Sequence, residues 1–206
     1  MTNKNYHHGN LRSALVEQAI KLLEEKGLAG LSLRRVARAA GVSQAAPYNH
    51  FKNKRDLLSA VAAKGFERFG QRMQQEAQAS VSNDSGANHY VAGLGKGYVM
   101  FALDNPSLYH LMFNGQMAGL IDVEQQQTAS AHSYNLLVDA LSKHPLKADE
   151  QPANLALDTA FAWSLVQGLS SLLLKGDFSA QQYGYDDVEP FIDALLSRYL
   201  RLDEVK

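Results

Sequence analysis

The sequence contains no cysteine. This absence excludes a disulfide framework, a thiolate zinc site and cysteine catalysis, and it is consistent with a reducing compartment. The first ten residues are polar and lack the apolar stretch of a secretory signal, so we expect a cytoplasmic protein. The sequence also lacks G-x-S-x-G, P-loop, G-x-G-x-x-G and H-E-x-x-H motifs, which disfavours the enzyme classes that those motifs identify.

Only one hydrophobic run approaches the length of a membrane span, at residues 155–174. Asp158 and Gln167 interrupt it, and a charge near the middle of a span is costly. We therefore predict a buried helix of a soluble protein. A hydrophobic content of 46% with 20% charged residues is ordinary for such a chain.

The net charge of −1 conceals an uneven distribution along the chain. Residues 1–55 hold ten Lys and Arg against three acidic residues, a net of +7, whereas residues 56–206 hold ten against eighteen, a net of −8. A basic surface of this kind can simply be solvated. A small basic segment on an acidic remainder is also typical of nucleic-acid binding.

Helical periodicity dominates the sequence and no alternating β pattern is convincing, so we predict an all-α fold. The first helix is expected from Asn10 to Lys26, with Gly27 ending it. Ser32 is placed to cap a helix through Ala40, Ser43 one through about His50, and Asn53 a long helix after residue 54. Residues 80–87 have the composition of a linker. Further helices are expected near residues 88–104, 106–115, 119–143, 152–175 and 187–202.

Two short helices separated by Gly41 and Val42 predict a helix-turn-helix. Ala37 suits close packing between the two helices and Gly41 suits the turn. The second helix would enter the major groove, so its outward side should be polar or small. Gln44, Tyr48 and Asn49 fit that description, as do Ala45 and Ala46.

The pattern V-A-x-x-A-G-V-S-x-x-x-x-Y-x-H-F-x-x-K-x-x-L-L, from Val36 to Leu58, resembles the DNA-binding signature of the TetR family. The resemblance implies a homodimeric transcriptional regulator, a repressor released from a palindromic DNA operator by a small-molecule effector. It implies phosphate contacts by Tyr48, His50 and Lys54, and base contacts by Gln44, Ala45 and Asn49. Lys4, Tyr6 and His7 of the N-terminal arm could add backbone contacts. The DNA-binding residues that we predict are Arg34, Ser43, Gln44, Ala45, Tyr48, Asn49, His50 and Lys54.

Pro47 is unusual for a helix that reads the groove. It lacks an N–H and disfavours helical geometry at Ala46, but in the first turn the missing hydrogen bond costs less than in a helix interior. We expect the helix to be short and rigid.

The domain prediction assigns residues 1–55 to DNA binding and residues 80–206 to effector binding and dimerisation, connected by the helix at about 54–80. Residues 162–169 are similar to a W-x-x-x-H-G segment of one TetR subgroup, with Gln167 replacing the histidine. An effector site is predicted among the middle helices, because such sites are mostly apolar with few polar groups. Its candidate residues are Tyr98, Phe101, Tyr109, Met112, Phe113, Met117, Trp163 and Gln167. Plain core packing is the alternative for each of them.

Two apolar stripes near the C-terminus predict the dimer interface, because palindromic sites require two-fold proteins. They comprise Phe161, Leu165, Gly168, Leu169 and Leu172 in one helix, and Phe191, Leu195 and Tyr199 in the other. Packing within one chain is the alternative.

Two rival functions stay open. One is a helical ligand-binding module without DNA recognition, against which the basic surplus and the intact Tyr48, His50 and Lys54 argue. The other is a helical hydrolase using His89, His110 or His132 with Asp104 or Asp122, although no motif brings these residues together. His7, His8 and His50 have no Cys, Asp or Glu at ligand spacing, so we expect no metal and no cofactor.

Overall fold

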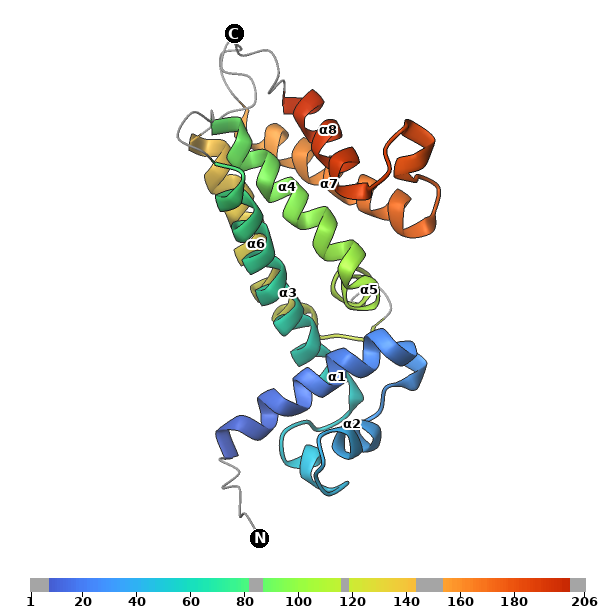
Figure 1. Ribbon diagram of the computed structural model, residues 1–206. Coiled ribbons are helices and arrows are strands. Elements are labelled where there is room, and N and C mark those ends of the chain that lie inside the picture. The colour runs from blue at the N-terminus through green and yellow to red at the C-terminus, as the bar shows by residue number, and fades with distance from the viewer. Residues whose placement is uncertain (1–7, 82–86, 116–118, 144–153, 201–206) are drawn as a thin grey trace. The chain divides into compact units, whose positions relative to one another are not determined.

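The computed structural model describes residues 8–81, 87–115, 119–143 and 154–200, and every regular element among them is helical (Figure 1). The all-α prediction is therefore confirmed. Contacts divide the chain into two compact units. We call the unit of residues 1–66 and 105–130 the head, and the unit of residues 67–104 and 131–206 the body. The linker predicted at 80–87 and the N-terminal arm lie mostly or wholly outside the described residues.

The head contains α1 (His8–Gly30), α2 (Leu33–Ala39), the 3₁₀ helix η1 (Ala46–Asn49), the first half of α3 (Lys54–Ala79) and α5 (Pro106–Asn114). Its core is apolar: Leu15, Leu23, Val36, Phe51 and Leu57 are each at most 2% exposed. The first helix is interrupted at Gly27 as expected, where φ is 64°, but helical turns resume as far as Gly30.

Two of the three predicted caps, Ser32 and Asn53, are present. The Ser32 side chain accepts a hydrogen bond from the Arg35 N–H at 3.3 Å, and Asn53 Oδ1 accepts one from the Asp56 N–H at 3.0 Å. Each cap satisfies an N–H that a helix start leaves without a partner. These two residues therefore set where α2 and α3 begin.

The body contains α4 (Ala87–Asp104), α7 (Leu155–Lys175), η2 (Ala180–Tyr183) and α8 (Val188–Leu200), together with the second half of α3 and most of α6 (Val123–Lys143). Helix α4 packs on both α7 and α8. It also approaches α3 closely, because Gly93 and Gly97 present no side chain toward the backbone of Ala77 and Met73.

The prediction that the apolar run at 155–174 is a buried helix is wrong. The run forms α7, but only 28% of its most apolar stretch is buried inside the chain. One face, with Ala162, Val166 and Leu169, packs into the body, while the other face carries Phe161 at 55% exposure. By length and composition alone, α7 is the one helix among the described residues that could cross a membrane. If α7 does not cross a membrane, its exposed apolar face needs another explanation.

Candidate nucleic-acid interface and effector pocket

A tight turn joins α2 to the segment that carries the predicted base contacts. Gly41 has a φ of 69°, a left-handed conformation that favours glycine, and the Val42 N–H donates to the Ala37 carbonyl at 3.0 Å. Ala37 is completely buried where α2 meets η1. The turn predicted from Ala37 and Gly41 is thus present, and it fixes the direction of the following residues.

The predicted second helix differs from expectation. Instead of an α-helix from Ser43 to His50, the chain forms a 3₁₀ helix from Ala46 to Asn49, preceded by a turn in which the Ala46 N–H donates to the Ser43 carbonyl at 3.1 Å. No side chain caps η1, so the assignment of Ser43 as N-cap is wrong. Pro47 in the first turn supplies the reason, because it disfavours α-helical geometry at the residue before it.

The segment has one buried side and one exposed side. Pro47 and Phe51 are buried, Phe51 to 1% exposure, and they anchor the segment to the head. Gln44, Ala45 and Asn49 are exposed, and Tyr48 is 51% exposed. His50 is partly exposed. The structure therefore brings the predicted base-reading residues together on one outward surface, with Ser43 exposed beside them.

Two basic residues close to this surface hold backbone carbonyls at the end of α1. The Lys54 ammonium donates to the Leu28 carbonyl at 2.8 Å, and the Arg35 guanidinium donates to the Gly30 carbonyl at 2.8 Å. Arg34 is exposed on α2. Sequence reasoning missed the structural role of Lys54, because its partner lies 26 residues earlier in the chain. An ammonium has three N–H groups, so this bond leaves Lys54 able to donate elsewhere.

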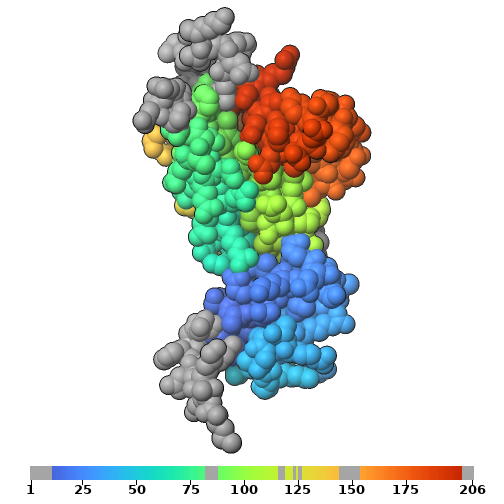
Figure 2. All heavy atoms as spheres, viewed as in Figure 1, coloured from blue at the N-terminus to red at the C-terminus, as the bar shows by residue number. Residues whose placement is uncertain are grey.

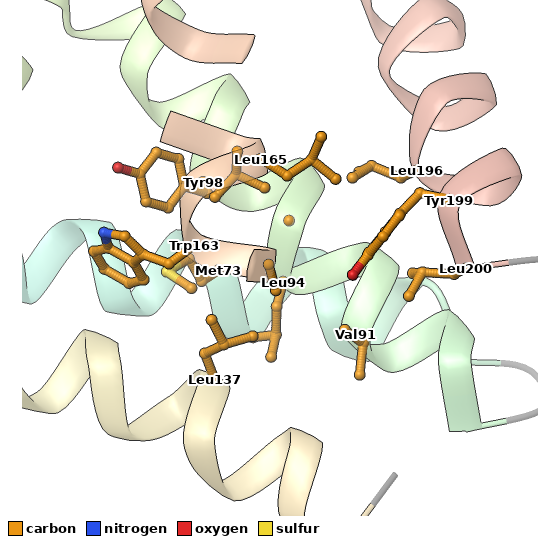
Figure 3. A pocket seen from close by; sticks show the side chains of 13 residues that line it. Met73, Val91, Leu94, Tyr98, Leu137, Trp163, Leu165, Leu196, Tyr199 and Leu200 are labelled. Atoms are coloured by element: carbon orange, nitrogen blue, oxygen red, sulfur yellow. The ribbon is translucent and has the colours of Figure 1, made fainter. Parts of the chain in front are cut away.

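The body contains a small apolar pocket between α4, α7 and α8, with about 30 Å³ of free volume (Figure 3). That volume suits a water molecule or two, so a larger occupant would have to widen it. Figure 3 places Tyr98 and Trp163 on one side of the pocket and Tyr199 on the other. None of the residues that line the pocket is charged; they are Met73, Val91, Leu94, Gly95, Tyr98, Leu137, Ala162, Trp163, Leu165, Val166, Leu196, Tyr199 and Leu200.

Gln167 ties the two aromatic walls together. Its Oε1 accepts hydrogen bonds from the Trp163 Nε1–H at 3.1 Å and from the Tyr98 hydroxyl at 3.4 Å. The rings of Tyr98 and Trp163 meet edge to face, with centroids 5.3 Å apart. The side-chain carbonyl of Gln167 therefore orients both rings. The predicted effector residues Tyr98, Trp163 and Gln167 do come together.

The remaining predicted effector residues lie elsewhere. Phe101 packs on Phe69 in the body, with centroids 5.3 Å apart. Tyr109, Met112 and Phe113 belong to the head, where Phe113 meets Tyr109 at 4.7 Å. Met117 lies outside the described residues. Sequence reasoning missed Val91, Leu94 and Gly95, although their spacing with Tyr98 marks a single face of α4.

Tyr199 is the polar group at the α8 side of the pocket. Burial raises the pKa of its hydroxyl from 10.0 to about 12, and the negative charge of Asp158 acts in the same direction. The hydroxyl is consequently protonated at neutral pH and able to donate a hydrogen bond. Its ring packs against Phe161, with centroids 5.1 Å apart.

The predicted dimer residues divide into exposed and covered ones. Phe161 and Leu195 are 55% and 37% exposed, and Leu157 beside them on α7 is 66% exposed. Gly168 is also exposed, whereas Leu165, Leu172 and Tyr199 are partly covered. Leu169 and Phe191 are 7% and 3% exposed, so they pack within the chain itself. In Figure 2, α7 and α8, in orange and red, lie side by side on the body.

The residues of the hydrolase alternative have other contacts. Asp104 forms an ion pair with Arg72 at 3.4 Å, and the Asp122 N–H donates to Ser59 Oγ at 2.9 Å. His110 lies 3.3 Å from the Asn114 amide on the same helix. Among the described residues, no group of three His, Cys, Asp or Glu side chains could hold a metal ion.

Comparison with known proteins gives two family matches. Residues 15–61 match bacterial regulatory proteins of the tetR family, and residues 91–199 match the tetracyclin repressor-like C-terminal domain. The class C tetracycline repressor of Escherichia coli is 51% identical over 51 residues, which are 25% of this chain and 23% of that protein. An HTH-type transcriptional regulator of Staphylococcus aureus is 29% identical over 105 residues, 50% of this chain and 54% of that one. The chain thus spans about half or less of the curated relatives that it matches.

Solved structures extend the likeness over nearly the whole chain. A Rhodococcus sp. RHA1 protein of unknown function is 31% identical with a TM-score of 0.78, and 97% of this chain and 98% of that one are covered. AibR, solved in complex with isovaleryl coenzyme A and operator DNA, has a TM-score of 0.62 at 18% identity over 91% of this chain and 96% of that one. At that identity the likeness shows the fold alone. The W-x-x-x-H-G subgroup is identified by none of these matches and stays a prediction.

Proposed function

Because the chain belongs to the TetR family of bacterial regulatory proteins, we propose that it is a sequence-specific DNA-binding transcriptional regulator. Members of that family regulate transcription and are not enzymes. We propose further that it is a cytoplasmic repressor, bound as a homodimer to a palindromic operator. The observation that carries the proposal is the exposed row of Gln44, Tyr48 and Asn49 on a turn anchored by the buried Pro47 and Phe51.

The head divides into positioning contacts and reading contacts. Gln44, Ala45 and Asn49 face base edges, because a glutamine or asparagine amide can pair with adenine in the major groove. Phosphate contacts, which fix the register on the duplex, are made by Arg34, Tyr48, His50 and Lys54. The Ser43 hydroxyl, in the turn before η1, donates a hydrogen bond to a phosphate as well. The net charge of +7 on residues 1–55 adds attraction that does not depend on sequence.

The exposed apolar face of α7 and α8 is the dimer interface. Phe161, Leu195 and Leu157 are the large hydrophobic side chains that this face exposes in the single chain. Apolar surface of this kind is stable in water when a second surface covers it. A two-fold partner would cover it and would also present two heads to two half-sites. This interface accounts for an α7 that is apolar and yet mostly exposed.

The effector is an uncharged, mostly apolar small molecule that binds the pocket between α4, α7 and α8. None of the described lining residues carries a charge, so an ionic ligand would lose its hydration without gaining a partner. The hydroxyl of Tyr199 donates a hydrogen bond to an acceptor on the ligand, which suits a carbonyl or an ether. We propose that residues 1–55 are the domain for DNA binding and that residues 80–206 serve effector binding and dimerisation, although residues 105–130 of this second part belong to the compact unit of the head.

Selection of bound duplexes from random DNA tests the DNA-binding proposal. The expected product is a palindrome with half-sites about one helical turn apart, bound much more tightly than a scrambled duplex. Recovery of no enriched sequence would overturn the proposal in favour of a ligand-binding module.

A screen of small molecules against the selected duplex tests the effector proposal. Neutral apolar compounds are expected to weaken duplex binding, whereas matched carboxylic acids or amines are not. The substitution Leu94→Trp, which fills the pocket from α4, should abolish the response while leaving duplex binding intact. A compound that acts equally on both proteins would bind elsewhere.

A further inference from the structure

The N-terminus of α5 is capped by a carboxylate from a different helix. Both oxygens of Glu24 on α1 accept backbone N–H groups of the first turn of α5: Leu108 N–H at 2.7 Å and Ser107 N–H at 3.1 Å. Asn105, at the N-cap position, makes no side-chain capping bond, and Pro106 follows it. The start of a helix has N–H groups without partners and a partial positive charge, so a carboxylate there is well placed.

A second attachment joins the segment after α5 to α3. Ser59 Oγ accepts the Asp122 N–H at 2.9 Å, and the Arg55 guanidinium donates to the Ile121 carbonyl at 3.3 Å. The described residues of this segment, 105–115 and 119–122, are therefore held to α1 at one end and to the first half of α3 at the other. These attachments explain why this segment forms one compact unit with the DNA-reading elements, although it is distant from them in sequence.

The Glu24 cap lies at the point where the chain passes from the pocket helix into the head. Helix α4 supplies Val91, Leu94 and Tyr98 to the pocket, ends at Asp104, and is separated from α5 by Asn105 alone. A displacement of the end of α4 therefore reaches the start of α5 through the covalent chain. Glu24 connects this first turn to α1, which packs against both α5 and α2.

We propose that Glu24 is the positioning residue that couples the effector pocket to the DNA-reading surface, by holding the first turn of α5 to α1. The inference rests on the proposed function, because it concerns how two sites of one regulator influence each other. Coupling between two binding sites is reciprocal, so DNA bound at the head must alter α4 if a ligand at α4 alters DNA binding. The coupling can therefore be measured without knowing the effector.

The test uses hydrogen exchange by mass spectrometry on the full chain, free and bound to a duplex recovered from the selection. The variants are Glu24→Ala, Glu24→Gln, and the neighbouring Glu25→Ala as control, since Glu25 is exposed. In the wild-type protein and in Glu25→Ala, the duplex should slow exchange in α4 at least threefold. In Glu24→Ala that response should disappear, while α2 and η1 are still protected by the duplex.

Glu24→Gln separates coupling from folding, because its amide oxygen can still accept one of the two N–H groups. Glu24→Gln should retain the native fold and restore part of the α4 response. As a check that the cap itself is lost, hydrogen exchange at Ser107 and Leu108 should be at least tenfold faster in Glu24→Ala than in Glu25→Ala. An α4 response in Glu24→Ala equal to that of Glu25→Ala would overturn the inference alone. Failure of the selection to yield any duplex would instead overturn the proposed function.

Discussion

At the scale of single residues, Gln44 and Tyr48 are both exposed but make different contacts in our proposal: Gln44 contacts a base and Tyr48 contacts a phosphate. Gln44 reads a base, and an amide paired with adenine N6 and N7 contributes discrimination of about 1–3 kcal/mol. Gln44→Ala should therefore cost that amount on the selected duplex and almost nothing on a scrambled duplex, with an unchanged salt dependence. Titration of both duplexes at several salt concentrations gives the answer. Equal losses on the two duplexes would mean that Gln44 does not face a base.

Lys54 should behave in the opposite way. A phosphate contact releases counterions without reading sequence, so Lys54→Ala should weaken both duplexes alike and reduce the salt slope by about one unit. Its hydrogen bond to Leu28 adds a stability loss of about 1 kcal/mol, to be measured separately by denaturant unfolding. Lys52→Ala, at an exposed lysine two residues earlier, is the control for charge alone. An effect on the selected duplex only would contradict the assignment.

Tyr199 provides a prediction about pH. Its pKa is raised to about 12 by burial and by Asp158, whereas an unfolded tyrosine titrates near 10. Since the folded protein holds this proton more tightly, the associated stability is complete below pH 10 and is lost as the pH rises toward 12. The difference in absorbance at 295 nm between wild-type and Tyr199→Phe should show a midpoint near 12, which Asp158→Asn should lower. A midpoint near 10 would place the hydroxyl in bulk water.

At the scale of helices, the close contact between α3 and α4 depends on Gly93 and Gly97, and Gly95 on the same helix serves as a control for Gly97. A Cβ at Gly97 would lie 2.6 Å from the Met73 Cα and 2.9 Å from the Arg72 carbonyl, so the two backbones would have to separate. A Cβ at Gly95 would meet only the movable ends of Leu196 and Val166, at 3.2 and 3.3 Å. Overpacking costs about 1–3 kcal/mol and alanine regains about 1 kcal/mol of helix propensity. Gly97→Ala should thus be ~1–2 kcal/mol less stable than Gly95→Ala in urea unfolding, and equal stabilities would argue against close packing.

Local signals predicted the head well because its elements depend on neighbours in the sequence. Ser32, Gly41 and Asn53 act within four residues, and each does what its residue type favours. The sequence shows that Pro47 is unusual in a helix, but it does not predict the 3₁₀ geometry, because a single sequence does not say how a 3₁₀ turn competes with an α-helix.

Hydrophobic periodicity does not predict which residues distant in the sequence contact each other. Tyr109 and Met112 are buried on one face of α5, at 4% and 0% exposure, but their spacing does not say that this face belongs to the head. Glu24 accepts hydrogen bonds from backbone N–H groups 83 and 84 residues later in the chain, and Lys54 donates to a carbonyl 26 residues earlier. No local sequence pattern marks such bonds. For the same reason, periodicity does not distinguish the covered Leu169 from the exposed Phe161.

At the scale of the whole molecule, the exposed face of α7 and α8 and the proposed palindromic operator require the same thing, a two-fold partner. The single chain has a mass of 22.6 kDa, and we expect twice that mass in sedimentation at micromolar concentration. Substituting the covered Leu169 would test the fold rather than the interface. The exposed Phe161 and Leu195 are better sites, because a glutamate at either position is solvated in the monomer and buried only in the dimer.

The double substitution Phe161→Glu and Leu195→Glu should therefore split the dimer without unfolding the chain. Each buried, unpaired charge costs at least about 2 kcal/mol, and the two substituted positions each appear twice in a two-fold interface, so the total is about 8 kcal/mol and the dimer Kd should rise by more than about a hundred-thousandfold. Val81→Glu, at a residue that is 48% exposed outside α7 and α8, is the matched control and should remain dimeric. The split protein should remain folded but bind the palindrome no better than an isolated half-site, because the two heads are no longer linked. If the double variant still sediments as a dimer, the two chains associate through another surface, and the exposed face of α7 must be covered by something else.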